Sequence, residues 1–291
     1  MIKNLVKNII GFGPIPSLLH KALKRQGITI LAYHGVITKP LPFDDWCFID
    51  EQTFEDQIAY LAKHFRIVHL SEAVKMLDEG KVSEPTAVIT FDDGYLNNYD
   101  VAYPILQRYN APATIYLVSD QIGTDETIWF CRLNQAIAET TSSSLDWNGY
   151  TFDLSNEGAK SATSATIQRS LKGMHNHRLN QEVADLINTL GGDPTRTIES
   201  DSPYRLMSQA EIAEMQASGL VEFGAHTCSH AILSRLSSDE QKQEIEGSKS
   251  AVEALSGQPC IHFAYPNGGP QDHDPETASI INNAGFISCV N

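Results

Sequence analysis

Short apolar runs alternate with helical patterns along most of the chain. Continuous apolar runs of this kind are typical of strands covered on both faces. They predict strands at residues 28–33, 67–70, 87–91, 113–118, 220–226, 261–265 and 286–290. Apolar residues at helical spacing predict helices at 53–65, with Thr53 as its cap, and at 71–80, 99–110, 207–219, 237–257 and 274–285.

Alternating strands and helices predict a parallel sheet covered by helices. About seven strand–helix repeats fit a (β/α) barrel better than an open doubly wound sheet. The chain also lacks the glycine fingerprint of a dinucleotide-binding fold. We therefore expect an α/β protein built on a barrel.

Residues 121–205 interrupt this rhythm with a polar stretch rich in Ser and Thr. We expect an insertion on the barrel, with some helix near 129–139 and 164–190 and no strand–helix unit of its own. Insertions on barrels often lie over the active face, which favours a lid or a subsite wall. A mobile surface excursion is the alternative.

Charge separates the N-terminal segment from the remainder. The 291-residue chain has a net charge of −15, which argues against binding to a nucleic-acid backbone. Residues 1–27 carry only basic charges, and their apolar residues recur at helical spacing. We expect a basic helical segment at 1–27, followed by one domain at 28–291. The segment is either a helix packed on the domain or an interfacial membrane helix.

Cysteine usage and hydropathy bear on the compartment. The five cysteines are odd in number and form no CxxC pair, which favours a reducing compartment over a disulfide framework. The first residues contain no unbroken apolar core of a signal peptide, and no run approaches the length of a membrane span. We expect a cytoplasmic protein, with peripheral membrane contact through residues 1–27 as an alternative.

Polar side chains follow the predicted strands. In a barrel the carboxyl ends of the strands meet on the active face. These positions are occupied by His34, Asp92, Asp93, Asp120, His226 and the turn at residues 265–267. The adjacent carboxylates of Asp92 and Asp93 repel each other, and a cation at the strand ends would stabilise them.

His226 and His230 are four residues apart, so that one helical turn would place both imidazoles on one side. Two histidines and one carboxylate make a facial metal site with open positions, and Asp93 is the natural third ligand. Asp92 would then lie beside the metal and act as the base for an activated water. In a chain with ten histidines the pair could also arise by chance. Cys228 is either a small buried filler or a thiolate ligand.

The motifs "TFDDG" at 90–94 and "HTCSH" at 226–230 resemble the polysaccharide deacetylases of carbohydrate esterase family 4, the NodB-homology domain. Residues 33–35, 112–118 and 263–269 are also similar to that family, and the resemblance covers roughly residues 28–290 without the insertion. It implies a distorted (β/α)7 barrel that removes acetyl groups from N-acetylated amino sugars of the N-acetylglucosamine type.

The resemblance also implies roles for the motif residues. Asp92 corresponds to the catalytic base, and Asp93, His226 and His230 correspond to the metal ligands. Thr227 matches the position whose hydroxyl fixes the loop between the histidines. Zinc is the first expectation for the metal, with cobalt or nickel as alternatives.

The turn "FAYPNG" at 263–268 departs from the commonest form of the family. Ala264 stands where many members have an Arg that orients the catalytic Asp, and this variant is familiar from an exopolysaccharide branch. The backbone N–H of Asn267 would face the oxyanion, and Tyr265 could line the sugar site. Trp129, in the insertion, could stack on a sugar ring or serve as a packing anchor.

The donor of the proton for the leaving amine stays unassigned. In the family this role belongs to the His of a Leu-x-His motif, which lies beyond the strand at which this sequence stops. His34 is one candidate, and Asp92 could return the proton that it took. Two other functions stay open: hydrolysis of a non-sugar amide or imide, and metal or glycan binding without catalysis.

Overall fold

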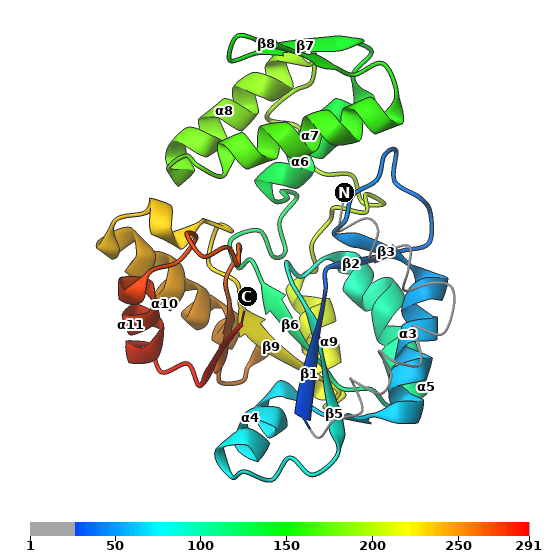
Figure 1. Ribbon diagram of the computed structural model, residues 1–291, viewed down its shortest axis with the longest axis vertical. Coiled ribbons are helices and arrows are strands. Elements are labelled where there is room, and N and C mark those ends of the chain that lie inside the picture. Colours follow the sequence, from blue (N-terminus) through cyan, green and yellow to red (C-terminus); the bar gives the residue numbers. More distant parts are fainter. Residues whose placement is uncertain (1–26, 291) are drawn as a thin grey trace.

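The structure is a computed structural model that describes residues 27–290. These residues form a curled sheet with helices around it and a second, smaller helical layer above the ends of the strands (Figure 1). The predicted basic helix at 1–27 lies almost wholly outside the described residues, so both interpretations of it stay predictions.

The sheet of the described chain is parallel at every pairing. Its seven strands follow the order β1-β5-β6-β9-β10-β11, with β4 paired to β5. The strands are β1 (Gly27–Tyr33), β4 (Arg66–Ile67), β5 (Pro85–Phe91), β6 (Ala113–Leu117), β9 (Val221–Ala225), β10 (His262–Ala264) and β11 (Ser288–Val290). The barrel prediction is confirmed in the form of a curled half-barrel. Its strands β5 and β6 are buried almost throughout, which explains their continuous apolar runs.

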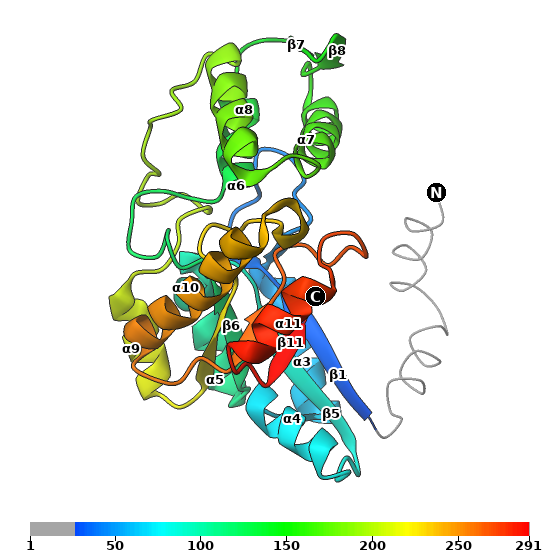
Figure 2. The same cartoon turned by 90° about the vertical axis from the view of Figure 1, so that its left-hand side faces the viewer.

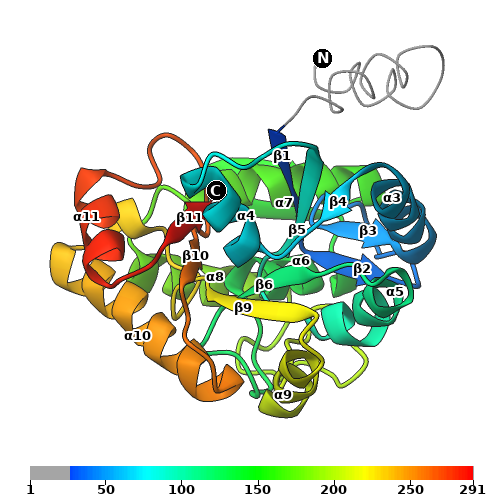
Figure 3. The same cartoon turned by 90° about the horizontal axis from the view of Figure 1, so that it is seen from below.

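Helices cover the outer side of the curled sheet, as the view from below shows (Figure 3). They are α3 (Glu51–His64), α5 (Tyr103–Tyr109), α9 (Gln209–Ala217), α10 (Ser238–Ser256) and α11 (Pro275–Asn283). The short helix α4 (Leu70–Asp78) instead lies at the lower end of the sheet (Figure 1). Thr53 was expected to cap α3, but the cap is Asp50, whose carboxylate accepts a hydrogen bond from Thr53 N at 2.9 Å. The strand predicted at 67–70 is shorter, because Leu70 already begins α4.

Several short elements near the strand ends were not predicted from the sequence. Strands β2 (Gly35–Ile37) and β3 (Phe48–Asp50) pair in parallel beside the main sheet. A π-helical turn, η1 (Asn98–Ala102), precedes α5, and a 3-10 turn, η2 (Leu233–Arg235), precedes α10. Three-residue strands and single turns are too short to carry a hydrophobic period.

The insertion forms the separate upper layer in Figures 1 and 2. It contains α6 (Trp129–Glu139), the hairpin β7 (Ser144–Trp147) and β8 (Tyr150–Asp153), α7 (Glu157–Leu171) and α8 (Asn176–Thr189). The helix expected near 129–139 is α6, and the helix expected near 164–190 is present as the two helices α7 and α8. The hairpin was missed although its signal was present: Asn148 and Gly149 both have positive φ, 50° and 78°, as a two-residue hairpin turn requires.

Between residues 27 and 290, no helix is both long and apolar enough to cross a membrane. The expected division into a basic segment, a deacetylase domain and an insertion stays a prediction.

Candidate metal centre and active site

The carboxyl ends of four strands converge on one cavity of about 270 Å³. The backbone hydrogen bonding of the sheet extends as far as the site residues. Asp92 N donates to Tyr33 O at 2.9 Å, and His226 N donates to Leu117 O at 3.0 Å. The residues lining the cavity are Ala32, His34, Asp45, Trp46, Cys47, Asp92, Asp93, Phe130, Gln168, Lys172, His230 and 265–268.

The predicted metal ligands come together at this cavity, which Asp93 and His230 line. The Nε2 atoms of His226 and His230 lie 3.6 Å and 3.3 Å from Asp93 Oδ1. The ligand atoms of the three residues all lie within 4.8 Å of one another, and all three side chains are buried. Neither carboxylate oxygen of Asp93 has a hydrogen-bond partner among the described residues. A buried carboxylate that two imidazoles face without such a partner is the arrangement that a cation would complete.

The protonation of these groups also fits a metal. His226 Nδ1 lies 2.9 Å from Ala264 O and therefore donates to this carbonyl, which leaves the Nε2 lone pair facing Asp93. Burial, and then the neighbouring His230, lowers the pKa of His226 to about 3, so the ring is neutral at neutral pH. Burial alone would raise the pKa of Asp93, but the surrounding histidines hold it below its usual range. Two imidazoles and a carboxylate form a donor set suited to zinc, cobalt or nickel.

Backbone strain concentrates at this cluster. Between residues 27 and 290, five non-glycine residues have positive φ, and three of them are Asp93 (75°), Thr227 (65°) and His230 (59°). Such conformations cost roughly 1–3 kcal/mol each and persist where the surrounding structure enforces them. The chain thus adopts unfavourable backbone angles where the ligands are presented.

The loop between the two histidines is fixed in an unexpected way. The hydroxyl of Thr227 was expected to fix it, but Thr227 Oγ1 is buried and has no hydrogen-bond partner in the described region. Glu244 on α10 takes this role: its Oε2 accepts from Cys228 N at 2.8 Å and from Ser229 N at 2.9 Å, and its Oε1 accepts from Ser229 Oγ at 2.6 Å. Nothing in the spacing of the sequence connects position 244 with this loop.

Cys228 is not part of the cluster. Its Sγ lies 3.6 Å from Glu244 O, and burial raises the pKa of the thiol to about 12. Cys228 therefore lies outside the ligand set, but it is half-buried rather than the fully buried filler that was expected. All five cysteines lie within the described region and are free thiols.

Asp92 lies beside the cluster without belonging to it. Its Oδ2 is 3.8 Å from His34 Nε2, and the two side chains are 20% and 18% exposed. Burial, with a further contribution from Asp93, raises the pKa of Asp92, and burial lowers the pKa of His34. The backbone of His34 is held from η1, because Asn98 Nδ2 donates to His34 O at 2.6 Å. The cavity thus holds a carboxylate and an imidazole next to the three candidate ligands.

The remaining predicted residues divide into two groups. Tyr265 and Asn267 line the cavity, and Asn267 Nδ2 is buried without a hydrogen-bond partner in the region described. Trp129 is only 4% exposed and packs edge-on against Phe130, so its burial supports the packing interpretation over sugar stacking. Asp120 is exposed and does not line the cavity.

The insertion supplies residues that the sequence did not assign. Phe130 on α6 packs against His230 with ring centroids 5.4 Å apart, and Gln168 and Lys172 reach the cavity from α7 and its end. Trp46, between β2 and β3, lies 5.1 Å from the His34 ring. The wall interpretation of the insertion is therefore the better one. An aromatic residue directly after two acids, at 44–46, was the only sequence signal for Trp46.

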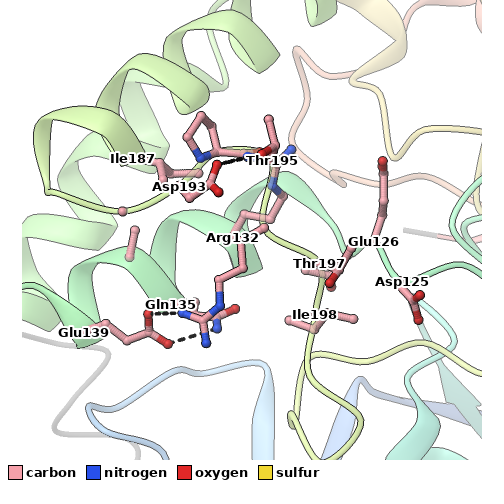
Figure 4. Close-up of a pocket in the computed structure, with 15 residues that line it drawn as sticks. Asp125, Glu126, Arg132, Gln135, Glu139, Ile187, Asp193, Thr195, Thr197 and Ile198 are labelled. Atoms are coloured by element: carbon pink, nitrogen blue, oxygen red, sulfur yellow. Dashed lines mark hydrogen bonds and ion pairs between the residues drawn. The ribbon is translucent and has the colours of Figure 1, made fainter.

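A separate hollow of about 300 Å³ lies in the insertion, between α6 and residues 192–198 (Figure 4). Two of its charged groups pair with each other, because Arg196 Nη1 donates to Glu139 Oε2 at 2.7 Å. None of the candidate ligands lines it. The chemistry therefore points to the cavity at the strand ends.

Comparisons with known proteins show which proteins this chain resembles. The chain is 33% identical to YxkH of Bacillus subtilis over 105 residues, which are 35% of this chain and 36% of that protein. It is 35% identical to a poly-beta-1,6-N-acetyl-D-glucosamine N-deacetylase of Staphylococcus epidermidis over 77 residues, 26% of this chain and 27% of that one. The matches thus span only about a third or less of these curated relatives.

Two solved structures share the fold over most of the chain. The deacetylase PplD of Streptococcus pyogenes, solved with acetate, has a TM-score of 0.56 at 17% identity and covers 89% of this chain and 81% of its own. IcaB from Ammonifex degensii has a TM-score of 0.56 at 19% identity, with coverages of 90% and 82%. Identities this low establish the fold alone.

The family model for polysaccharide deacetylase matches residues 79–287, which include Asp92, Asp93 and both histidines of the cluster. That match covers well over half of the chain. The protein therefore belongs to the polysaccharide deacetylase family.

Proposed function

We propose that this protein is a metal-dependent deacetylase that removes N-acetyl groups from saccharides of the N-acetylglucosamine type. One observation carries the proposal: Asp93, His226 and His230 converge as a buried ligand set directly beside the carboxylate of Asp92. Two His and one carboxylate hold a metal while leaving open positions for water and substrate. Family membership and the name of the staphylococcal relative support N-acetylglucosamine polymers as the substrate class.

In this proposal Asp93, His226 and His230 hold the metal, with zinc as the first choice. When bound, a divalent metal would polarise the substrate carbonyl, lower the pKa of water towards neutrality and favour the ionised form of Asp92. Asp92 takes the proton from the attacking water, because it is the carboxylate next to the ligand set that is not itself a ligand.

Two further groups complete the reaction. His34, 3.8 Å from Asp92, is placed to exchange a proton with it and so to serve the leaving amine. Asn267 lines the cavity and supplies a hydrogen-bond donor for the oxyanion, from its backbone as predicted or from its unpartnered amide. Loss of one such donor costs on the order of 10²–10³ in rate.

The proposal is tested by acetate release from β-1,4- and β-1,6-linked N-acetylglucosamine oligomers, with and without a chelator. We expect release that the chelator abolishes and added zinc restores. Asp92→Asn should reduce it at least a hundredfold with metal content unchanged, whereas the exposed Asp78→Asn is the matched control and should behave as the wild type.

His226→Ala tests the ligand set separately. We expect it to lose bound metal in elemental analysis of the purified protein. Unchanged metal content in this variant would overturn the ligand assignment. Full activity in Asp92→Asn would overturn the base, and absence of acetate from every saccharide would favour a non-sugar amide or a binding role.

A further inference from the structure

A second hollow adjoins the catalytic cavity. It has a volume of about 400 Å³ and lies between the β2–β3 connection, residues 38–47, and helix α7 of the insertion. Asp45, Trp46 and Gln168 line both this hollow and the catalytic cavity of about 270 Å³. A molecule that extends out of the catalytic cavity past Trp46 therefore enters the second hollow.

The walls of this hollow are tied together by polar contacts. Asn134 on α6 donates from Nδ2 to Asp45 Oδ2 at 2.8 Å, and its Oδ1 accepts from Gln168 Nε2 at 3.0 Å. Further along α7, Ser161 Oγ donates to Asp44 O at 3.0 Å. The β2–β3 connection is thus joined to the insertion at two points, so the hollow is pre-formed. Pre-formed sites bind more tightly because less ordering is required on binding.

Trp46 offers an unusual surface at the boundary of the two hollows. Its side chain is 75% exposed, although Trp is normally well buried. Its ring stands edge-on to His34, with centroids 5.1 Å apart and an interplanar angle of 75°. Tryptophan anchors are enriched where binding energy concentrates, because the indole buries a large area with few rotatable bonds. An exposed indole face beside the reactive residues suits the C–H face of a pyranose ring.

The charges in the second hollow restrict its occupant. Asp44 is exposed, Asp45 is half-buried, and among the described residues no Lys or Arg lines the hollow. The other polar groups are hydroxyls and amides from α6 and α7. A uronic acid or a phosphate would meet carboxylates here without a compensating cation. Hydroxyl, acetamido and ammonium groups would instead find acceptors.

We propose that the second hollow binds the hexosamine residue next to the one being deacetylated, with Trp46 stacked on its ring and Asp44 and Asp45 accepting from its polar groups. The inference rests on the proposed function for the class of substrate. It adds that the insertion forms part of the binding site for the neighbouring residue of the saccharide chain.

Calorimetric titration tests this proposal without relying on turnover. The zinc-loaded Asp92→Asn protein would be titrated with N-acetylglucosamine and with its β-1,4- and β-1,6-linked dimers and tetramers. We expect a lower Kd for the dimer than for the monosaccharide in at least one linkage series. In the same background, Trp46→Ala should weaken tetramer binding about tenfold, and Trp46→Phe should restore most of it.

Two further variants locate the effect. Ala165→Trp fills the second hollow from α7 and should remove the advantage of the dimer over the monosaccharide. Tyr150→Ala removes a similarly exposed aromatic residue, 71% exposed, from the β7–β8 hairpin and should change nothing. Thermal melts check that each variant is folded.

The outcomes separate the two proposals. Binding that does not depend on length, binding unchanged in Trp46→Ala and Ala165→Trp, or no binding of any oligomer would overturn the second-hollow assignment. If the wild type releases no acetate but binds oligomers through Trp46, the deacetylase proposal fails and the binding site stands. If acetate is released while Kd is independent of length, the deacetylase proposal stands and the binding site fails.

Discussion

Glu244 offers a direct test of how the metal ligands are held. Its carboxylate accepts three hydrogen bonds from the loop between His226 and His230, at 2.8, 2.9 and 2.6 Å. Glu244→Ala would leave the backbone N–H groups of Cys228 and Ser229 without their acceptor. His230, at the end of this loop in a positive-φ conformation, would lose part of what enforces it.

The structure sets the size of the effect. An unsatisfied buried N–H costs about 1–3 kcal/mol, and the low end applies here because the loop is half-buried and water can reach it. Two such groups predict a loss of about 2 kcal/mol in the free energy of unfolding of the metal-free protein. Groups that orient metal ligands typically contribute 10–100-fold to affinity, or about 1.4–2.8 kcal/mol.

Two measurements check this expectation: urea unfolding of the metal-free protein and zinc competition with a chromophoric chelator. Glu244→Gln keeps an oxygen for both N–H groups and an NH₂ for Ser229 Oγ, so it should retain most of the affinity. Glu246→Ala, an exposed position of the same helix, is the control. Wild-type zinc affinity in Glu244→Ala, or an equal loss in Glu246→Ala, would refute the reasoning.

Three further predictions follow from single contacts. Gly94→Ala should destabilise the protein by about 1–3 kcal/mol in urea unfolding. Gly94 has a φ of 78°, and a Cβ at this position would lie 2.7 Å from Leu117 Cδ2. An unfolding midpoint equal to that of the wild type would contradict this prediction. Burial acts to raise the pKa of Glu222, but its contacts with neighbouring groups, first among them His262, hold this pKa below its usual range. The Glu222 carboxylate therefore contributes fully to stability at neutral pH, and this contribution is lost as the pH falls below about 4.3. Thermal melts of Glu222→Gln should therefore differ from the wild type at pH 7 and converge in acid, whereas a gap independent of pH would count against this. Cys228→Ser should bind zinc as the wild type does in the competition assay, since the thiol lies against Glu244 O and is not part of the cluster of Asp93, His226 and His230; a tenfold loss of affinity would reinstate the ligand interpretation.

The sequence was most informative where a regular pattern of apolar residues extends over a whole strand or helix and where a motif is short and contiguous. The buried runs of β5 and β6 and the helical spacing of α10 were predicted within a few residues. Errors arose at short elements. The strands β2 and β3 have three residues each, and the strands of the missed β7–β8 hairpin have four.

The cluster of ligands could be anticipated because the parallel strands that precede Asp93 and His226 bring the two residues close together in space. Asp93 and His226 each follow a parallel strand, and such strands end on the same face of the sheet. Any chain with these strands would bring the two residues near each other. The chemistry of a carboxylate and two imidazoles then limits the site to a few metals.

Tertiary structure alone decided which groups surround that cluster. Glu244 reaches the loop from the side of a helix, and Trp46 and Gln168 meet at the cavity from segments far apart in the chain. Trp129 and Trp46 are equally aromatic in the sequence, yet one is 4% exposed and the other 75%. Burial depends on how the insertion packs against the barrel, and a pattern of residue types along the chain does not specify that packing.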